Sequence, residues 1–166
     1  MRYDYILAVF ITMVRWEHSM GQYVKKSLSE WEYNEFLELI REFQSKEQCH
    51  EPIEHYREEL LRYTDHPEVI YDYAISDMPV QEIADISLMW QNEWPVLTRE
   101  QLTSLVEKIM SGEGTEAEDT IDLEVFSVNC KHPGESDLIF WPSLVFGENV
   151  EPTVEQIVDT AMTGEV

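Results

Sequence analysis

The stretch FLELIREF, residues 36–43, returns in changed form 66 residues later as LTSLVEKI, residues 102–109. In both stretches apolar side chains recur at i, i+3, i+4 and i+7. This is the spacing of the buried stripe of an amphipathic helix. The two stretches therefore predict corresponding helices and, with them, a helical fold that contains a repeat.

Both predicted helices carry a start signal. Ser29 with Glu32, and Thr98 with Gln101, fit the capping box, in which each side chain accepts a hydrogen bond from the other residue's backbone N–H. We expect each pair to fix the first turn of its helix.

The register extends beyond these two helices. The same shift of 66 residues aligns His66-Pro67 with His132-Pro133, and a shift of 74 aligns VQEIADIS (80–87) with VEQIVDTA (154–161). We therefore predict a tandem duplication, in which a diverged first copy precedes a second copy. The predicted units are an N-terminal extension at residues 1–27, the first copy at 28–94 and the second at 95–166.

The predicted fold class is all-α, with two small antiparallel four-helix bundles in tandem. Because a bundle of this size is marginal alone, we expect the halves to pack on each other through part of the N-terminal segment. The helices are expected at 29–44, 51–65, 68–75 and 79–92 in the first copy, and at 98–111, 115–130, 135–141 and 152–163 in the second.

The apolar run ILAVFITMV, residues 6–14, is nine residues long and therefore too short to span a bilayer. Asp4 precedes it, and no small-residue cleavage site follows. We interpret the run as a buried element of an N-terminal extension that packs on the fold, and we expect a cytoplasmic protein with no membrane contact.

The charge balance is extreme, with 34 acidic against 11 basic side chains and a formal net charge of -23. Direct binding to nucleic acid is disfavoured because the phosphate backbone would be repelled. A basic protein partner is favoured instead. An enzyme is not expected, because no catalytic set has a recognisable local context and no glycine-rich phosphate loop is present.

Cys49 and Cys130 lack CxxC spacing, which predicts two free thiols in a reducing compartment. A zinc site built from these cysteines with His50 and His132 would also lack the tight ligand spacing of such sites. We therefore expect no cofactor and no metal.

The stretch HPGESDLIFWP, residues 132–142, joins a carboxylate to two adjacent aromatic rings. In a helical turn, Asp137, Phe140 and Trp141 would share one face, while Leu138 and Ile139 would point towards the core. Two rings beside one carboxylate are typical of the central residues of protein interfaces. The alternative is that both rings belong to the core.

This stretch, after an acidic helix and before VEQIVDTA, resembles the immunity proteins of colicin and pyocin DNases, whose third helix reads HP-x-x-SDLIYYP. The resemblance is close over residues 95–163 and faint over 28–92. It implies a protein that binds the basic nuclease domain of a cognate bacteriocin beside its active site and so inhibits it, without chemistry of its own.

The resemblance also implies site residues. Ser136, Asp137, Phe140, Trp141 and Pro142 match the family's binding turn, but Phe140 and Trp141 replace two tyrosines, so both phenol hydroxyls are lost. The family's specificity helix corresponds to 115–130. There the expected partner-choosing residues are Glu116, Glu118, Asp119, Asp122 and Ser127.

Two other functions fit the sequence. A DNA mimic would present its carboxylates as false phosphates and bind many DNA-binding proteins, with a steep dependence on salt. A helical adaptor would have no inhibitory role. The first copy reads EVIYDYAISDMP after His66-Pro67 and lacks the adjacent ring pair, so we expect it to be a scaffold or an auxiliary contact.

Overall fold

A computed structural model describes residues 26–48, 55–90 and 93–166 of the chain. These residues form helices and no strand, which confirms the predicted all-α class. None of their helices is long and apolar enough to cross a membrane. The predicted N-terminal element at 6–14 lies outside the described residues.

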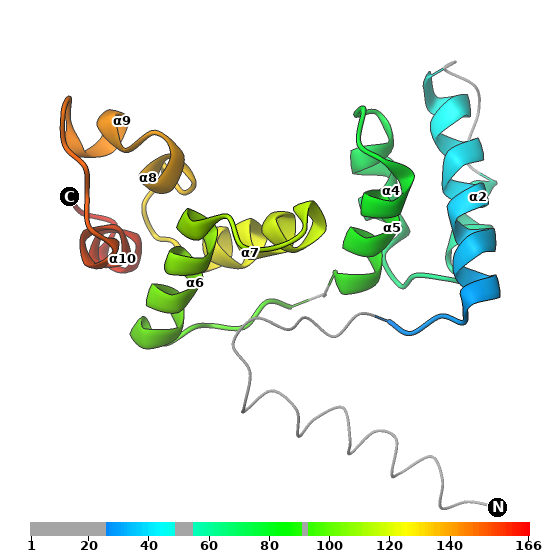
Figure 1. Cartoon of the computed structure of the whole chain (residues 1–166), viewed down its shortest axis with the longest axis horizontal. Coiled ribbons are helices and arrows are strands. Elements are labelled where there is room, and N and C mark those ends of the chain that lie inside the picture. The colour runs from blue at the N-terminus through cyan, green and yellow to red at the C-terminus, as the bar shows by residue number, and fades with distance from the viewer. Residues whose placement is uncertain (1–25, 49–54, 91–92) are drawn as a thin grey trace, which may run out of the picture.

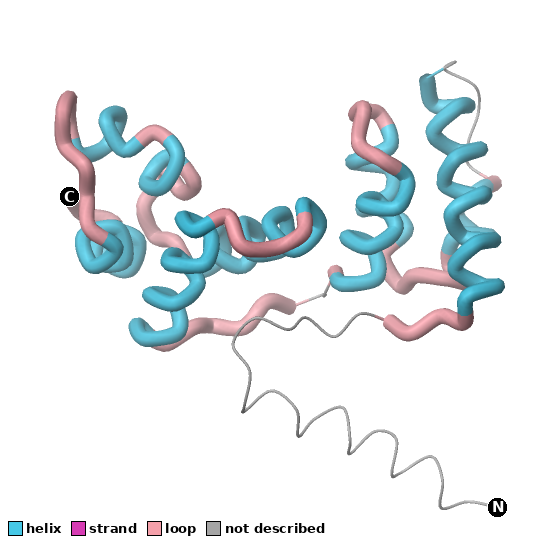
Figure 2. Tube along the Cα trace, in the orientation of Figure 1, coloured by secondary structure: helices cyan, strands magenta, loops and turns pink. Residues whose placement is uncertain are grey.

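The helices form two groups along the chain. In Figure 1, α2, α4 and α5 stand side by side, α7 runs between them and α6, and α8 to α10 lie at the far end; Figure 2 shows the loops that join them. The helices are α2 (Glu30–Gln48), α3 (Tyr56–Leu60), α4 (Pro67–Ala74), α5 (Val80–Met89), α6 (Arg99–Ser111), α7 (Glu116–Asn129), α8 (Asp137–Phe140), α9 (Pro142–Phe146) and α10 (Val154–Thr163).

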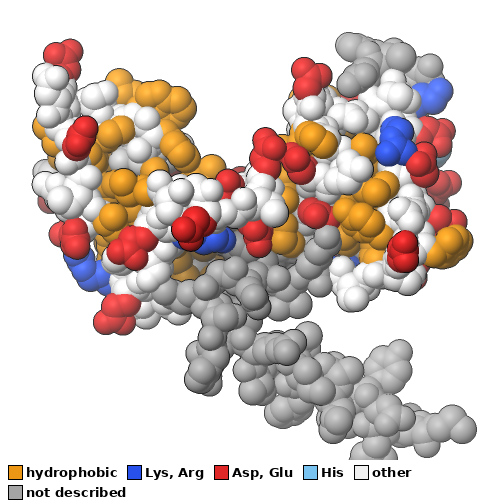
Figure 3. Space-filling model, viewed as in Figure 1, with side chains coloured by type: hydrophobic (Ala, Val, Ile, Leu, Met, Phe, Trp, Pro, Cys, Tyr) orange, Lys and Arg blue, Asp and Glu red, His pale blue; other side chains and the backbone are white. Residues whose placement is uncertain are grey.

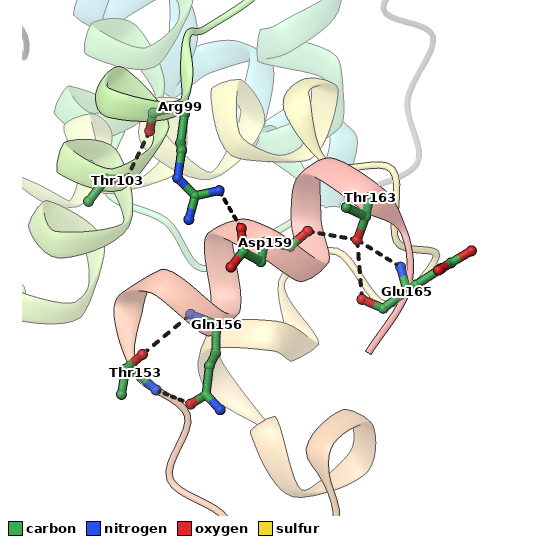
Figure 4. Close-up of polar contacts among 7 residues, drawn as sticks. All are labelled: Arg99, Thr103, Thr153, Gln156, Asp159, Thr163 and Glu165. Atoms are coloured by element: carbon green, nitrogen blue, oxygen red, sulfur yellow. Dashed lines mark hydrogen bonds and ion pairs between the residues drawn. The ribbon is translucent and has the colours of Figure 1, made fainter.

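Side chains fix the starts of several helices. The predicted capping boxes are present at Thr98–Gln101, on α6, and at Ser29–Glu32, where the Ser29 N–H donates to the Glu32 carboxylate at 2.8 Å. Figure 4 shows the equivalent box at the start of α10 and the ion pair that joins Arg99 on α6 to Asp159 on α10. These local bonds explain why the starts of these helices could be expected from sequence.

Several helix ends differ from the predictions. α2 continues past residue 44 to Gln48, and α3 ends at Leu60 instead of 65. Just beyond α3, the Thr64 hydroxyl donates to the Ser87 carbonyl at 2.8 Å and accepts from the His66 N–H, which commits this segment to a turn. α5 ends at Met89 instead of 92, because Trp90 is extended.

A short helix, α9, was not predicted. Trp141 leaves the helical conformation at the end of α8, and Pro142 then occupies the first position of α9. Proline suits that position because its missing N–H would have no partner in the first turn.

Buried apolar residues form three clusters. One lies inside the first group of helices, a second lies inside α6 to α10, and a third lies between α5 and α7. The third cluster consists of Val69, Ile86 and Met89 from the first half, with Ala117, Ile121 and Val125 from α7. The 66-residue register aligns buried residues in the first two clusters, Phe36 with Leu102 and Leu60 with Phe126.

Within the described residues, the halves meet chiefly where α5 packs against α7. The expected packing through the N-terminal segment falls on residues outside the described part of the chain. Asn129 at the end of α7 also holds the linker. Its amide donates to the Pro95 carbonyl at 2.9 Å and accepts from the Leu97 N–H at 2.7 Å. The duplication itself and the domain boundaries stay predictions.

Candidate functional site

Helix α7 is covered on two of its three faces. Ala117, Ile121 and Val125, at i, i+4 and i+8, pack on the first half of the chain. Phe126 faces the opposite way and is fully buried in the core of the second half. Because both faces are apolar, α7 has no single polar side. Its more exposed residues lie mainly on a third stripe and at its C-terminal end, where Val128 is 61% exposed.

The stripe left open on α7 is formed by Glu116, Thr120, Leu123 and Ser127, at i, i+4, i+7 and i+11. Glu116 is exposed and the other three are partly exposed. Leu123 is partly exposed and belongs to none of the three apolar clusters of the described residues. Thr120 and Leu123 were missed in the sequence analysis, although their spacing from Glu116 and Ser127 could have indicated them.

Asp122 does not lie on the open stripe, and the prediction that it selects a partner is wrong. Its side chain is buried on the side of α7 that faces α6, where its carboxylate lies 2.6 Å from the Lys108 ammonium. A buried carboxylate needs such a partner because the cost of removing it from water is large. Asp122 therefore stabilises the packing of α6 on α7.

The remaining predicted acids of α7 differ in whether their carboxylates already form hydrogen bonds within the helix. The Glu118 carboxylate is engaged at the start of the helix, where it accepts from the Thr115 N–H at 2.9 Å. Asp119 and Glu116 are not used in that capping box. The Glu116 carboxylate, however, lies against Glu82 of α5 and, after burial, helps to raise the pKa of that residue. Of the acids expected to face a partner, Asp119 is therefore the better placed.

The second part of the candidate site is the turn of α8. Asp137 opens the helix, and the Trp141 N–H donates to the Asp137 carbonyl at 3.0 Å, which fixes the turn. Leu138 is fully buried and Ile139 packs against the same core, as the helical turn predicted. Phe140 and Trp141 remain 47% and 58% exposed, so they are not core residues.

The two exposed rings lie together. Their centroids are 6.1 Å apart and their planes meet at 65°, an edge-to-face arrangement. Asp137 and Ser136 are partly exposed beside them, and Pro142 ends the turn. The structure thus brings the five predicted residues of the binding turn onto one short segment, whose buried anchor is Leu138.

Carboxylates crowd the space between α4, α7 and the loop before α8. Partial burial raises the pKa of Glu124 on α7, and the charge of Glu135 raises it further. Burial also raises the pKa of Tyr73 on α4, and the Glu124 carboxylate adds to this effect. Figure 3 shows a broad hollow between the two groups of helices, with acidic side chains around it. A basic partner would relieve this repulsion.

The residues around the His132-Pro133 turn stabilise the local structure. The Nδ1 atom of His132 accepts from the Gly134 N–H at 3.0 Å, and the Cys130 thiol lies 3.5 Å from the His132 carbonyl. The part of the chain that the structure describes contains no cluster of ligands that could hold a metal ion. Cys49 and His50 lie outside that part.

A comparison with known protein families matches the part of the chain that contains α7 and the turn of α8. Residues 96–163 match the family described as colicin immunity protein / pyocin immunity protein. This part of the chain is similar to the immunity proteins of that family, and it is called the immunity domain below. It comprises α6 to α10 and includes both the open stripe of α7 and the turn of α8. The match indicates a role in bacteriocin immunity.

The immunity domain covers the second half of the chain, and the four described helices of the first half lie outside the match. No match was found in the comparisons with curated proteins and with solved structures. The comparisons therefore indicate no function for the first half, and its surface is the remaining source of information.

Proposed function

We propose that this protein binds the basic nuclease domain of a cognate bacteriocin, a DNase above all, and inhibits it by occupying a surface beside the active site. The observation that carries the proposal is the exposed pair Phe140–Trp141 next to Asp137, within the immunity domain. Exposed rings of this size on a short rigid turn are suited to fill pockets of a partner.

The strong negative charge of this chain supports a basic partner. The chain carries a net charge of -23, and the open stripe of α7 adds Glu116 beside Asp119. Such a field accelerates the encounter with a basic protein and weakens as salt rises. The rings supply most of the affinity and the carboxylates most of the association rate.

The test is cleavage of plasmid DNA by the cognate nuclease, whose gene is expected beside that of this protein, at low and at high salt. The wild-type chain is expected to inhibit stoichiometrically at both. Asp137→Ala and Trp141→Ala are each expected to weaken inhibition. The matched controls are Asp77→Ala and Ile75→Ala, which remove an exposed acid and an exposed apolar side chain from the first half.

The other two functions give different outcomes. Inhibition that is indifferent to both site variants and disappears at high salt would indicate a DNA mimic. No inhibition of an active nuclease would leave a helical adaptor and contradict the proposal.

A further inference from the structure

The first half carries a groove that the immunity function does not use. It runs along α2 and the end of α3 and has a volume of about 670 Å³. Its apolar part includes Trp31, Leu39 and Tyr63. Trp31 is 65% exposed. Beside Leu39 and Tyr63, its ring forms part of an apolar surface in the groove, and such contiguous surfaces are typical of interaction sites.

The corresponding face of the second half is a docking surface. In the 66-residue register, Leu97, Leu105 and Val125 stand where the groove has Trp31, Leu39 and Glu59. Those three residues of the second half belong to the cluster on which α5 packs. The helices around the two faces also correspond, because α2 packs on α3 and α5 as α6 packs on α7 and α10. The equivalence of the two faces rests on the predicted duplication.

The groove is therefore shaped like a face that receives a helix, but its charge differs. Four glutamates line it against two arginines, which leaves two negative charges in excess. Arg41 already pairs with Glu38, and Arg62 lies 5.4 Å from the centroid of the Tyr63 ring. Glu59, which replaces the apolar Val125 of the second half, is exposed and forms no ion pair with another residue in the part of the chain that the structure describes. A helix seated here would meet excess negative charge at the edge of its apolar stripe.

We propose that this groove is a docking site for a partner helix that carries an apolar stripe flanked by lysines or arginines. Trp31 and Leu39 receive the apolar stripe, and Glu59 pairs with one of the basic side chains. This is the helix-in-groove mode of recognition, with Trp31 as the aromatic anchor. The site is separate from the immunity turn and does not depend on toxin inhibition.

The probe is a synthetic amphipathic helix with a leucine stripe flanked by lysines, labelled for fluorescence anisotropy and added to the full chain. The same peptide with glutamates in place of the lysines serves as the charge control. The lysine peptide is expected to bind and the glutamate peptide to bind weakly or not at all. Binding is expected to weaken by about tenfold or more in Trp31→Ala, the usual loss for an aromatic anchor.

Two matched variants separate the groove from general charge and from the immunity turn. Glu59→Lys is expected to weaken binding more than Glu58→Lys, which changes the net charge equally but lies outside the groove. Trp141→Ala is expected to leave peptide binding unchanged. Because Trp31 is exposed, Trp31→Ala is expected to keep the wild-type helical content in circular dichroism.

Several results would overturn the proposal. These are no binding of the lysine peptide, binding that ignores Trp31→Ala, or binding that is lost in Trp141→Ala instead. Self-association of the wild-type chain that disappears in Trp31→Ala would assign the groove to a second copy. Protection of Trp31 from acrylamide quenching in the free chain would show that the chain's own residues fill it.

Discussion

Helices α4 and α8 both follow a His-Pro pair, yet they use their side chains in opposite ways. α4 has two turns and buries Val69, Ile70 and Ala74. α8 has one turn, buries Leu138 and leaves Phe140 and Trp141 exposed. The same start to a helix therefore serves packing in the first half and an exposed ring pair in the second.

The difference follows from length and neighbours. α4 lies between α2 and α5 and also contributes Val69 to the cluster between the halves, so most of its apolar side chains have partners. α8 contacts α9 and α10 and ends where Trp141 leaves the helical conformation. A short turn held by one buried leucine can present rings that a longer helix would bury.

The largest effect is expected from Ile70→Ala, which leaves a cavity in the core under α4. The free energy of unfolding should fall by about 2–5 kcal/mol, the usual cost of such a truncation. Urea denaturation followed by circular dichroism measures it. Ile75→Ala, just past the end of α4 and exposed, should change stability by less than about 0.5 kcal/mol. Equal losses in the two variants would contradict the assignment of α4 to packing.

Trp141→Ala should show the reverse behaviour. Its ring is largely exposed, so stability should change by less than about 1 kcal/mol. Binding of the bacteriocin domain, measured by calorimetry, should weaken by about 2–4 kcal/mol if the ring is a central contact. A large loss of stability with unchanged affinity would show that Trp141 contributes to packing, as the buried residues of α4 do, and not to binding.

Asp122→Ala and Asp119→Ala extend the comparison to α7. Removing the buried Asp122 carboxylate deprives Lys108 of its ion pair, and stability should fall by about 1–3 kcal/mol. Affinity for the bacteriocin domain should stay within a factor of about 2, because Asp122 does not reach the surface. Asp119→Ala should affect association rate more than stability. The assignment of Asp122 to the buried face and Asp119 to the exposed face would be contradicted if Asp122→Ala mainly lowered affinity and Asp119→Ala mainly lowered stability.

The smallest effect is expected at Glu124, beside Tyr73 of α4. Its raised pKa means that its charged form destabilises the folded chain, and this penalty appears as pH rises through the folded-state pKa. Glu124→Gln should therefore raise stability at neutral pH by less than about 1 kcal/mol, because the side chain is only partly withdrawn from water.

The pH dependence of this substitution supplies its control. At about pH 3, below the ordinary pKa of a glutamate, both states are protonated and the gain should vanish. Glu107→Gln, exposed on α6, should change stability less at neutral pH. A gain from Glu124→Gln that persisted at acid pH would point to helix propensity instead of charge.

The helical class and the starts of α2 and α6 could be predicted because their signals are local. Ser29 with Glu32, and Thr98 with Gln101, are capping boxes whose atoms lie within one turn. The end of α3 could not be predicted in this way, because the Thr64 hydroxyl donates to the carbonyl of Ser87, which is distant in sequence.

The candidate site was predicted in part for the same reason. In the turn of α8, the burial of Leu138 and the exposure of Phe140 and Trp141 follow from one short stretch of sequence. On α7 the sequence shows an acidic helix, but not that it is covered on two faces. That fact decides that Asp122 is buried and that Leu123 is partly exposed.

The apolar stripe of α7 that receives α5 has a consequence for how such chains arise. An immunity domain without helices α2 to α5 would expose Ala117, Ile121 and Val125 to water. Selection for solubility would then favour polar residues at those positions. In a set of related sequences, apolar residues there would distinguish chains with a preceding helical unit from chains that stand alone.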